Sequence, residues 1–574
     1  AMLVITAVYG GIALYDLGDM KAPETETMIT SSPVTIDLGV DTEISKLRYF
    51  LGAYNLDETR ELGIDYISAD GENVKTDTVS EGAVFYWNES EADVTARYIT
   101  LWTDAENLSI KEMGVIGADG TYVTPQNAAD NSIAAMFDEQ TLIPERATFR
   151  NGTYFDEIYH ARTAYEFIHH SQIYEWTHPP LGKLIIALGI MIFGMCPFGW
   201  RIAGTVVGII MVPVIYLFAK RFFKRSWLAA VMCILFAFDF MHFAQTRIAT
   251  IDVYVTFFII LMYYFMYRYT QMSFYDTPLK KTFAPLALCG ISMGLGIASK
   301  WTGVYAGAGL AVIFFGVLIR RYNEYRYALT DPTGETNGIS HSYVIKNFKT
   351  YAVKTILWCC IFFVAVPIVI YCLSYIPYMM TPSGNGLKTV TENMRSMYTY
   401  HSKTVLGSTH PYSSLWYQWP VMYRPIWYYS GTVSDSLKEG ISSFGNPAVW
   451  WTGIAAFAYM IYRAVLKRDK NAVFLIIAYL AQLVPWIPVS RLTFIYHYFP
   501  SVPFVVLMIG YSLCAFYAEA VTERGKKTVM YSSFAYAALA VVLFIMFYPV
   551  LSGHACTPEY VSHWLRWFPT WALL

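Results

Sequence analysis

The adjacent carboxylic residues Asp156 and Glu157 are the most chemically distinctive feature of this chain, because they stand just before a long and mostly apolar region. Ionisable side chains beside a bilayer cost free energy, so they usually serve a function. A carboxylate within hydrogen-bond reach of a hydroxyl group can accept its proton as a general base. We therefore predict that Asp156 and Glu157 are catalytic.

A second set of ionisable residues lies at or near the ends of apolar segments and comprises His178, Arg201, Asp239, Arg247, Asp252, Lys300, Arg491 and His497. Cations that converge on one membrane face would bind the phosphate of a lipid-linked donor, because charge-assisted hydrogen bonds to phosphate are strong. We predict that this set binds substrate. Two alternatives stay open: the cations could be interfacial anchors, and Arg247 could simply pair with Asp252. The histidine spacing matches no metal site, so no metal or other cofactor is predicted.

The composition predicts an α-helical polytopic membrane protein. Of the 574 residues, 55% are hydrophobic and only 15% are charged, whereas a soluble domain carries about a quarter charged residues. Residues 15–181 contain 30 Asp and Glu against 10 Lys and Arg, and the remaining chain is basic. An asymmetry of this kind usually separates the two sides of a membrane.

Short basic clusters predict the topology, because cytoplasmic loops are enriched in Lys and Arg. The clusters lie at 220–225, 280–281, 320–326, 346–354, 467–470 and 524–527. All of them fall on the cytoplasmic side if residues 183–197 lie along the interface instead of spanning the bilayer. With 1–16 as the end of a truncated first helix, the chain then has about 11 transmembrane helices and an outer C-terminus.

Residues 25–145 form a predicted extracellular β-sandwich inserted in the first outer loop. Apolar and polar residues alternate at 34–38, 46–50 and 96–101, and turn signals stand at 69–71 and 119–120. The stretches 34–39, 67–71 and 95–99 resemble the discoidin (F5/8 type C) fold, whose members often bind sugars. A sugar-binding module and a simple spacer remain equal alternatives for this domain.

The chain from residue 155 onward resembles the protein O-mannosyltransferases, which are polyprenyl-phosphate-mannose-dependent glycosyltransferases of the GT-C class. The resemblance rests on stretches in family order at 155–157, 178–183, 200–201, 247–252, 299–303, 410–414, 419–420, 496–500 and 567–571. It implies that Asp156 is the catalytic carboxylate, with Glu157 beside it, and that Arg201 is functionally important. Tyr159 stands where eukaryotic members have histidine, and 377–446 is too short for their MIR domain. Both departures indicate a bacterial member.

The resemblance implies a polyprenyl-phosphate-mannose–protein mannosyltransferase that transfers mannose, with inversion, to Ser/Thr hydroxyl groups of exported proteins. The expected catalytic membrane region is 146–376, followed by an outer loop at 377–446 and a C-terminal membrane region at 447–574. The expected partners are the donor lipid, the acceptor protein, membrane lipids and the export channel, with no nucleic acid. The expected location is the plasma membrane, with the active site and the β-sandwich outside. The alternatives are a GT-C transferase of another lipid-linked sugar, and a polytopic transporter or sugar receptor.

Cysteine labelling tests the topology. In a variant that lacks the native cysteines, a membrane-impermeant maleimide should label Asp104→Cys and Ser413→Cys from outside, but not Lys224→Cys or Lys526→Cys. Outside labelling of Lys224→Cys would mean that residues 183–197 cross the bilayer, and the topology would be wrong.

Overall fold

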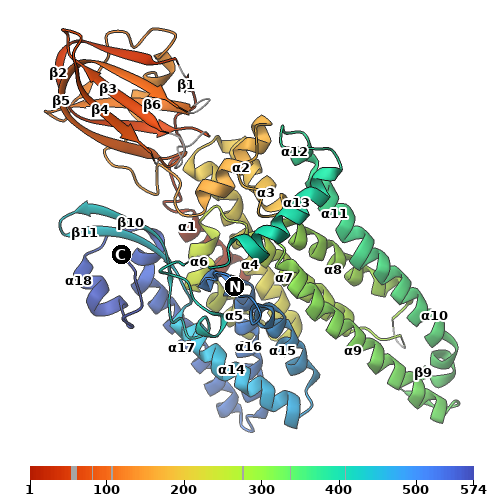
Figure 1. Cartoon of the computed structure of the whole chain (residues 1–574). Coiled ribbons are helices and arrows are strands. Elements are labelled where there is room, and N and C mark those ends of the chain that lie inside the picture. The colour runs from red at the N-terminus through yellow and green to blue at the C-terminus, as the bar shows by residue number, and fades with distance from the viewer. Residues whose placement is uncertain are drawn as a thin grey trace. The chain divides into compact units, whose positions relative to one another are not determined.

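The computed structural model describes residues 1–574 apart from 31, 54–60, 81, 105–107, 275–276, 337 and 408. The chain divides into two compact units. The first, which we call the sheet unit, comprises 16–174 and 186–203. The second, the helical unit, comprises 1–15, 175–185 and 204–574. Figure 1 labels the elements of both units.

The sheet unit is built on an antiparallel β-sheet (Figure 1). Its strands are β1 (Thr27–Ile29), β2 (Val34–Leu51), β3 (Leu62–Ile67), β4 (Asn73–Val79), β5 (Trp87–Thr103), β6 (Leu108–Gly117) and β7 (Tyr122–Val123). They pair in the order β1-β6-β2-β5-β3-β4, and β7 pairs with β6. The described strands therefore join into one hydrogen-bonded, seven-stranded sheet. The finer assignment to a discoidin-like sandwich stays a prediction.

Alternating side chains explain why these segments form strands, because successive residues of a strand point to opposite faces. The predicted stretches 34–38 and 46–50 lie in β2, and 96–101 lies in β5. The two long strands change register between Asp37 and Thr42 and again between Ile44 and Lys46. Inward side chains such as Leu47, Ile64, Ile99 and Met113 are fully buried in one core. The sheet thus has a hydrophobic core of its own.

Helix α2 (Glu157–His169) belongs to the sheet unit, and the residues of α3 (Leu181–Phe193) and of α4 (Pro197–Phe223) are divided between the two units. Helix α3 has 13 residues, which corresponds to about 20 Å, whereas the hydrocarbon core of a bilayer is about 30 Å thick. This length agrees with the prediction that the segment lies along the interface.

The helical unit contains most of the apolar helices. They are α1 (Met2–Leu14), α5 (Ser226–Ala237), α6 (Phe240–Thr246), α7 (Asp252–Thr270), α8 (Leu279–Ser299), α9 (Gly303–Thr330), α10 (His341–Cys360), α11 (Val366–Ser374), α14 (Pro447–Leu466), α15 (Lys470–Leu483), α16 (Val502–Glu519) and α17 (Glu523–Ser552). A π-helical turn at Ile361–Ala365 joins α10 to α11. Shorter elements are α12 (Ile376–Met379), α13 (Lys388–Thr399), α18 (Pro558–Tyr560), the hairpin β10 (Ile426–Ser434) with β11 (Leu437–Ser443), and the two-residue strands β8 (Glu335–Thr336) and β9 (Ile339–Ser340).

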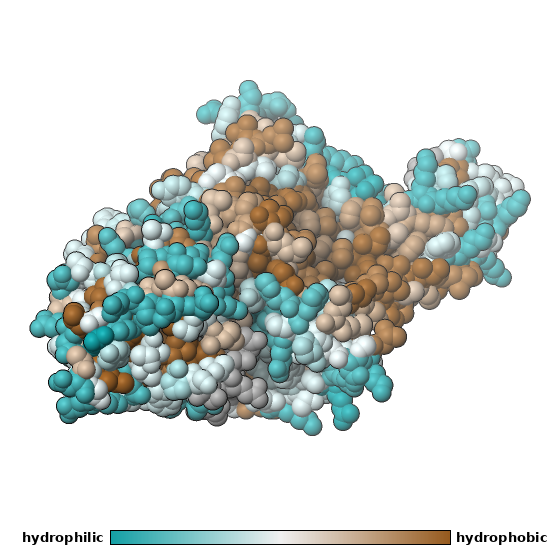
Figure 2. All heavy atoms as spheres, turned by 90° about the horizontal axis from the view of Figure 1, so that it is seen from above, coloured by the Kyte–Doolittle hydropathy of each residue, from teal (hydrophilic) through white to brown (hydrophobic). Residues whose placement is uncertain are grey.

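The protein is a multi-pass membrane protein. Among the described residues, 7 helices are long and apolar enough to cross a bilayer, and the bent pair α5–α6 raises this number to 8. The shorter apolar helices are Met2–Leu14, Leu181–Phe193 and Lys470–Trp486. Large apolar side chains such as Val312 and Phe315 on α9 and Ile545 on α17 are exposed, and Figure 2 shows broad brown areas of hydrophobic surface. The finer count of about 11 spans stays a prediction.

A glycine inside the sheet provides a test of its packing. Gly63 on β3 pairs with Trp102 on β5, and a Cβ atom at Gly63 would overlap the indole ring of Trp102. In the isolated segment 25–145, which we expect to fold alone as β structure, Gly63→Val should lower the free energy of unfolding by about 1–3 kcal/mol. Urea denaturation followed by circular dichroism measures this loss.

The control is Val74→Ala at an exposed position of β4, which should change the stability by less than about 0.5 kcal/mol. A disordered spectrum of the segment would contradict the assignment of an independently folding domain, and an unchanged stability of Gly63→Val would contradict the packing.

Candidate active site

Asp156 stands at the N-terminus of α2, where the chain leaves an unusual backbone conformation. Phe155 has a φ of 49°, which is uncommon for a residue with a side chain and marks local strain. Asp156 is the N-cap residue, yet its carboxylate does not cap the helix. Aspartate at this position normally accepts hydrogen bonds from the first turn. The half-buried carboxylate of Asp156 is therefore held at the helix end without serving as its cap.

Glu157 and Arg201 form a buried ion pair within the sheet unit. Arg201 Nε lies 2.7 Å from Glu157 Oε1, and Arg201 Nη2 lies 2.7 Å from Glu157 Oε2. Trp200 Nε1 donates to Glu157 Oε2 at 3.2 Å. The same guanidinium group donates to the carbonyl oxygens of Leu17 and Gly152, each at 2.9 Å. Arg201 thus fixes Glu157, and with it the first turn of α2, next to Asp156.

This geometry gives Arg201 a structural role beside the phosphate contact, which stays a prediction. Glu157 and Arg201 are 0% and 1% exposed, and each guanidinium nitrogen donates to a protein oxygen. Removing one partner of a buried ion pair leaves the other charge uncompensated at a cost of about 3–5 kcal/mol. The pair is therefore suited to position the Asp156 segment.

A polar cavity of about 430 Å³ lies within the helical unit. Its charged lining residues are Lys300 at the start of the turn before α9 and Arg491 in the loop that follows α15. Lys300 Nζ contacts both carboxylate oxygens of Asp252, at 2.8 and 2.9 Å. Among the residues that the structure describes, Asp252 thus pairs with Lys300 and not with Arg247, and no ion pair is found for Arg491. The cavity therefore carries a net positive charge.

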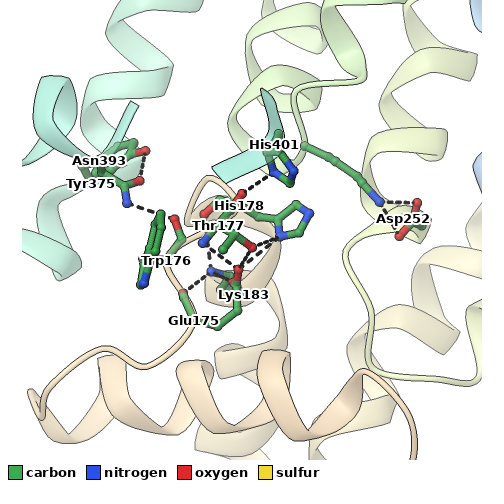
Figure 3. A network of polar contacts seen from close by, with 10 residues as sticks. Glu175, Trp176, Thr177, His178, Lys183, Asp252, Tyr375, Asn393 and His401 are labelled. Atoms are coloured by element: carbon green, nitrogen blue, oxygen red, sulfur yellow. Dashed lines mark hydrogen bonds and ion pairs between the residues drawn. The ribbon is translucent and has the colours of Figure 1, made fainter. Parts of the chain in front are cut away.

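The loop before α3 supplies another wall of this cavity, and Figure 3 shows its polar contacts. Glu175 is ion-paired with Lys183 and accepts hydrogen bonds from Thr177. Its Oε1 also lies 3.1 Å from His178 Nδ1. One buried carboxylate thus contacts Lys183 of α3 and the threonine and histidine of the loop, and it holds His178 at the cavity.

His401, which was not predicted from the sequence, lies opposite His178. It belongs to the π-helical turn Tyr400–Thr404 that continues α13, and its Nε2 lies 2.9 Å from the carbonyl oxygen of Thr177. Burial lowers the pKa of His401 to about 4, and burial also lowers the pKa of His178. Both rings are therefore neutral at pH 7, and the positive charge of the cavity comes from Lys300 and Arg491.

An apolar groove of about 580 Å³ adjoins the polar cavity in the helical unit. The two share Trp301 and Tyr305 in their walls. The groove runs between side chains of α8, α9, α11 and α13, including Met293, Val304, Pro367, Ile368, Val390 and Met394. A polar cavity that opens beside an apolar groove can hold a ligand with a charged head and a long hydrocarbon chain.

Four side chains connect the groove to the loop before α3. Trp301 Nε1 donates to the hydroxyl group of Tyr371 at 3.1 Å, and the hydroxyl groups of Tyr371 and Tyr375 lie 3.2 Å apart. Tyr375 then donates to Asn393 Oδ1 at 2.8 Å. Asn393 Nδ2 donates to the carbonyl oxygen of Trp176 at 2.9 Å. Helix α13 therefore contributes to the groove and also holds the loop.

The remaining predicted residues have structural contacts. Asp239 is fully buried and caps α6 by accepting from the backbone of Met241 and His242, and it also accepts from Asn446 and Trp450. Arg247 donates to the carbonyl oxygen of Tyr15 at 2.9 Å. His497 bonds Phe494 through Nδ1. These contacts position Asp239, Arg247 and His497 in the helical unit, and the substrate contacts predicted for these residues stay predictions.

Two family models match separate parts of the chain. Residues 177–329 match "Dolichyl-phosphate-mannose-protein mannosyltransferase", and residues 387–571 match "C-terminal four TMM region of protein-O-mannosyltransferase". Together they cover His178, Lys300, His401 and Arg491.

Relatives and a solved structure agree with these matches. The polyprenol-phosphate-mannose–protein mannosyltransferase of Mycolicibacterium smegmatis is 24% identical over 73% of this chain and 87% of its own length. The Corynebacterium glutamicum protein of the same name is 26% identical over 69% of this chain and 81% of its own length.

The Saccharomyces cerevisiae protein O-mannosyltransferase Pmt1-Pmt2 complex, solved with its sugar donor, superposes with a TM-score of 0.60 at 14% identity, over 73% of this chain and 89% of the matched chain. The helical architecture is thus the GT-C-type polytopic membrane fold, and the chain belongs to the protein O-mannosyltransferase family.

Proposed function

We propose that the chain transfers mannose from polyprenyl-phosphate-mannose to Ser/Thr hydroxyl groups of exported proteins at the outer face of the membrane. The observation that carries the proposal is the polar cavity that shares Trp301 and Tyr305 with an apolar groove. The activity named for the bacterial relatives supports the same reaction.

The shape of the two connected spaces matches such a donor. A polyprenyl chain is a long, uncharged hydrocarbon, and the groove presents mainly apolar side chains such as Val304, Ile368 and Val390. Burying apolar surface stabilises the complex by about 25 cal/mol per Å². The phosphate and the sugar would then lie in the polar cavity, next to Lys300, Arg491 and the two neutral histidines.

The charge of the cavity matches the phosphate. The phosphodiester of the donor carries one negative charge, and Asp252 offsets the charge of Lys300. Arg491 then supplies the balancing positive charge, and its planar guanidinium group can form two parallel hydrogen bonds to phosphate. When the bond to the sugar breaks, the leaving phosphate gains negative charge, so these cations stabilise the transition state more than the bound donor.

Asp156 is the proposed general base. It would accept the proton of the acceptor hydroxyl group while the hydroxyl oxygen forms a bond to C1 of mannose. The bond between C1 and the phosphate oxygen breaks, and polyprenyl phosphate leaves with the electron pair, so the configuration at C1 is inverted. Glu157 and Arg201 keep the backbone of Asp156 in place through their buried ion pair, which makes them positioning residues.

Replacement of Asp156 tests the base. Asp156→Asn keeps the size of the side chain but removes its basicity, so transfer of mannose to a Ser/Thr peptide should fall by about 10²–10⁴-fold. Radiolabelled polyprenyl-phosphate-mannose and the purified protein measure the rate. The matched control is Glu145→Gln, which changes an exposed carboxylate of the sheet unit and should keep the wild-type rate. Near wild-type turnover of Asp156→Asn would remove Asp156 as the base.

Replacement of Arg491 tests the phosphate contact. Arg491→Gln removes a charge-assisted hydrogen bond worth about 1.5–3 kcal/mol, so the KM for the donor should rise at least about tenfold. Lys388→Gln, at an exposed position of α13 outside the cavity, serves as the charge control. An unchanged KM for the donor in Arg491→Gln would mean that the phosphate binds elsewhere.

A further inference from the structure

A large cavity of about 950 Å³ in the helical unit lies apart from the proposed donor site. It is formed by residues 312–327 of α9, residues 470–477 of α15, the end of α7 with the residues after it, and the hairpin of β8 and β9. Arg320 lies in this cavity, and Lys300 lies in the proposed donor site. The stretch of α9 between them corresponds to about 25–30 Å, which is close to the thickness of the hydrocarbon core of a bilayer. Arg320 therefore lies far along α9 from the proposed donor site.

One half of this cavity is apolar. Val312, Gly316 and Val317 of α9 line it together with Val473 and Ile477 of α15. Val312 and Val473 are 58% and 41% exposed. A Cβ atom at Gly316 would meet no atom within 4 Å, so the space beside this glycine is open. The apolar half of the cavity therefore has open space beside α9.

The other half is polar and has an excess of positive charge. Its charged residues are Arg320, Lys470 and Glu324. Arg320 donates to the carbonyl oxygen of Thr270 at 2.9 Å, and its Nε lies 3.9 Å from Glu324. Lys470 is exposed, and no ion pair is found for it among the residues that the structure describes. The exposed Lys467 and Arg468 precede Asp469, which is the N-cap residue of α15.

We propose that this cavity binds an anionic glycerophospholipid. Its phosphate would contact Lys470 and Arg320, and an acyl chain would lie along Val312, Gly316 and Val473. The combination of a positive polar end with an open apolar channel fits this class of lipid, because each lysine or arginine near a membrane surface contributes about 1 kcal/mol toward anionic lipids. A zwitterionic lipid would gain the apolar contacts but not the net electrostatic attraction.

A lipid in this position would connect the two helices that also border the proposed donor site. Tyr305 of α9 packs against Trp486, just after α15, with ring centroids 5.7 Å apart. Arg491 follows a few residues later. A lipid that bridges Arg320 and Lys470 would therefore stabilise the packing of α9 against α15 at the end of the pair away from Tyr305.

Native mass spectrometry of the full chain, with dioleoylphosphatidylglycerol as the anionic probe and dioleoylphosphatidylcholine as the zwitterionic one, tests the proposal without measuring transfer. The wild-type protein should bind the anionic probe more tightly, and this lipid should raise its Tm. Lys470→Gln should weaken binding of the anionic probe about fivefold, in line with the loss of one lysine contact.

The apolar half is tested separately by Gly316→Leu, whose side chain would fill the open space and should abolish binding of the probe. Gly316→Leu should fold, because leucine is favoured over glycine in a helix by roughly 1 kcal/mol. The control is Lys527→Gln, an exposed lysine that does not line the cavity, and it should bind the probe as the wild type does.

Equal binding of the two lipids, or wild-type binding by Lys470→Gln and Gly316→Leu, would overturn the proposal. Displacement of the anionic probe by an equal amount of undecaprenyl phosphate would also overturn it, because the occupant would then be a polyprenyl carrier. None of these outcomes depends on the transfer reaction, so the proposed function is judged by its own experiments.

Discussion

The buried ion pair of Glu157 and Arg201 organises the sheet-unit part of the candidate site. A lone charge in a dry interior costs several kcal/mol, so neither residue is stable there without the other. The guanidinium group also satisfies the carbonyl oxygens of Leu17 and Gly152, which belong to segments far apart in the sequence. A single side chain thus joins the start of the unit, the segment before Asp156 and the helix α4. The position of Asp156 follows from this network, because Glu157 is its immediate neighbour.

The same rule of charge pairing gives the polar cavity its chemical character. Asp252 offsets Lys300, and Glu175 offsets Lys183. Burial keeps His178 and His401 neutral. Arg491 then stays as a cation for which the described residues supply no ion pair, in a cavity beside an apolar groove. Such a site favours a ligand with a single negative charge on a hydrocarbon chain over a neutral sugar or a free, multiply charged phosphate.

The sequence was sufficient to predict the membrane class and the strands, whereas the catalytic roles of Asp156 and Glu157 stay predictions. The alternation of apolar and polar residues predicted strands at 34–38 and 96–101. This pattern depends only on residues that are neighbours in the sequence, so it can be found without the structure. The roles of individual charges could not be predicted in the same way. Asp239 reads as an isolated intramembrane acid, yet it caps α6 and accepts from Trp450, which is 211 residues away.

Long-range partners explain the other differences between the predictions and the structure. The ion pair of Arg201 with Glu157 could not be predicted, because no local pattern connects two residues that are 44 positions apart. His401 was missed because a single histidine in a loop has no distinguishing spacing, and its importance appears only when α13 brings it to Thr177. The membrane side, the count of spans and the catalytic roles stay predictions.

The row of hydrogen bonds from Trp301 to Trp176 runs in one direction from donor to acceptor. An indole nitrogen can only donate, and a main-chain carbonyl oxygen can only accept. With these two ends fixed, Tyr371 must donate to Tyr375, and Tyr375 must donate to the amide oxygen of Asn393. The orientation of the Asn393 amide is then determined, with its nitrogen toward Trp176. The row of hydroxyl groups therefore has one proton order, and the carbonyl oxygen of Trp176 keeps that order even without Trp301. A ligand that took the donor of Trp301 would leave the hydroxyl oxygen of Tyr371 as an acceptor for a new donor.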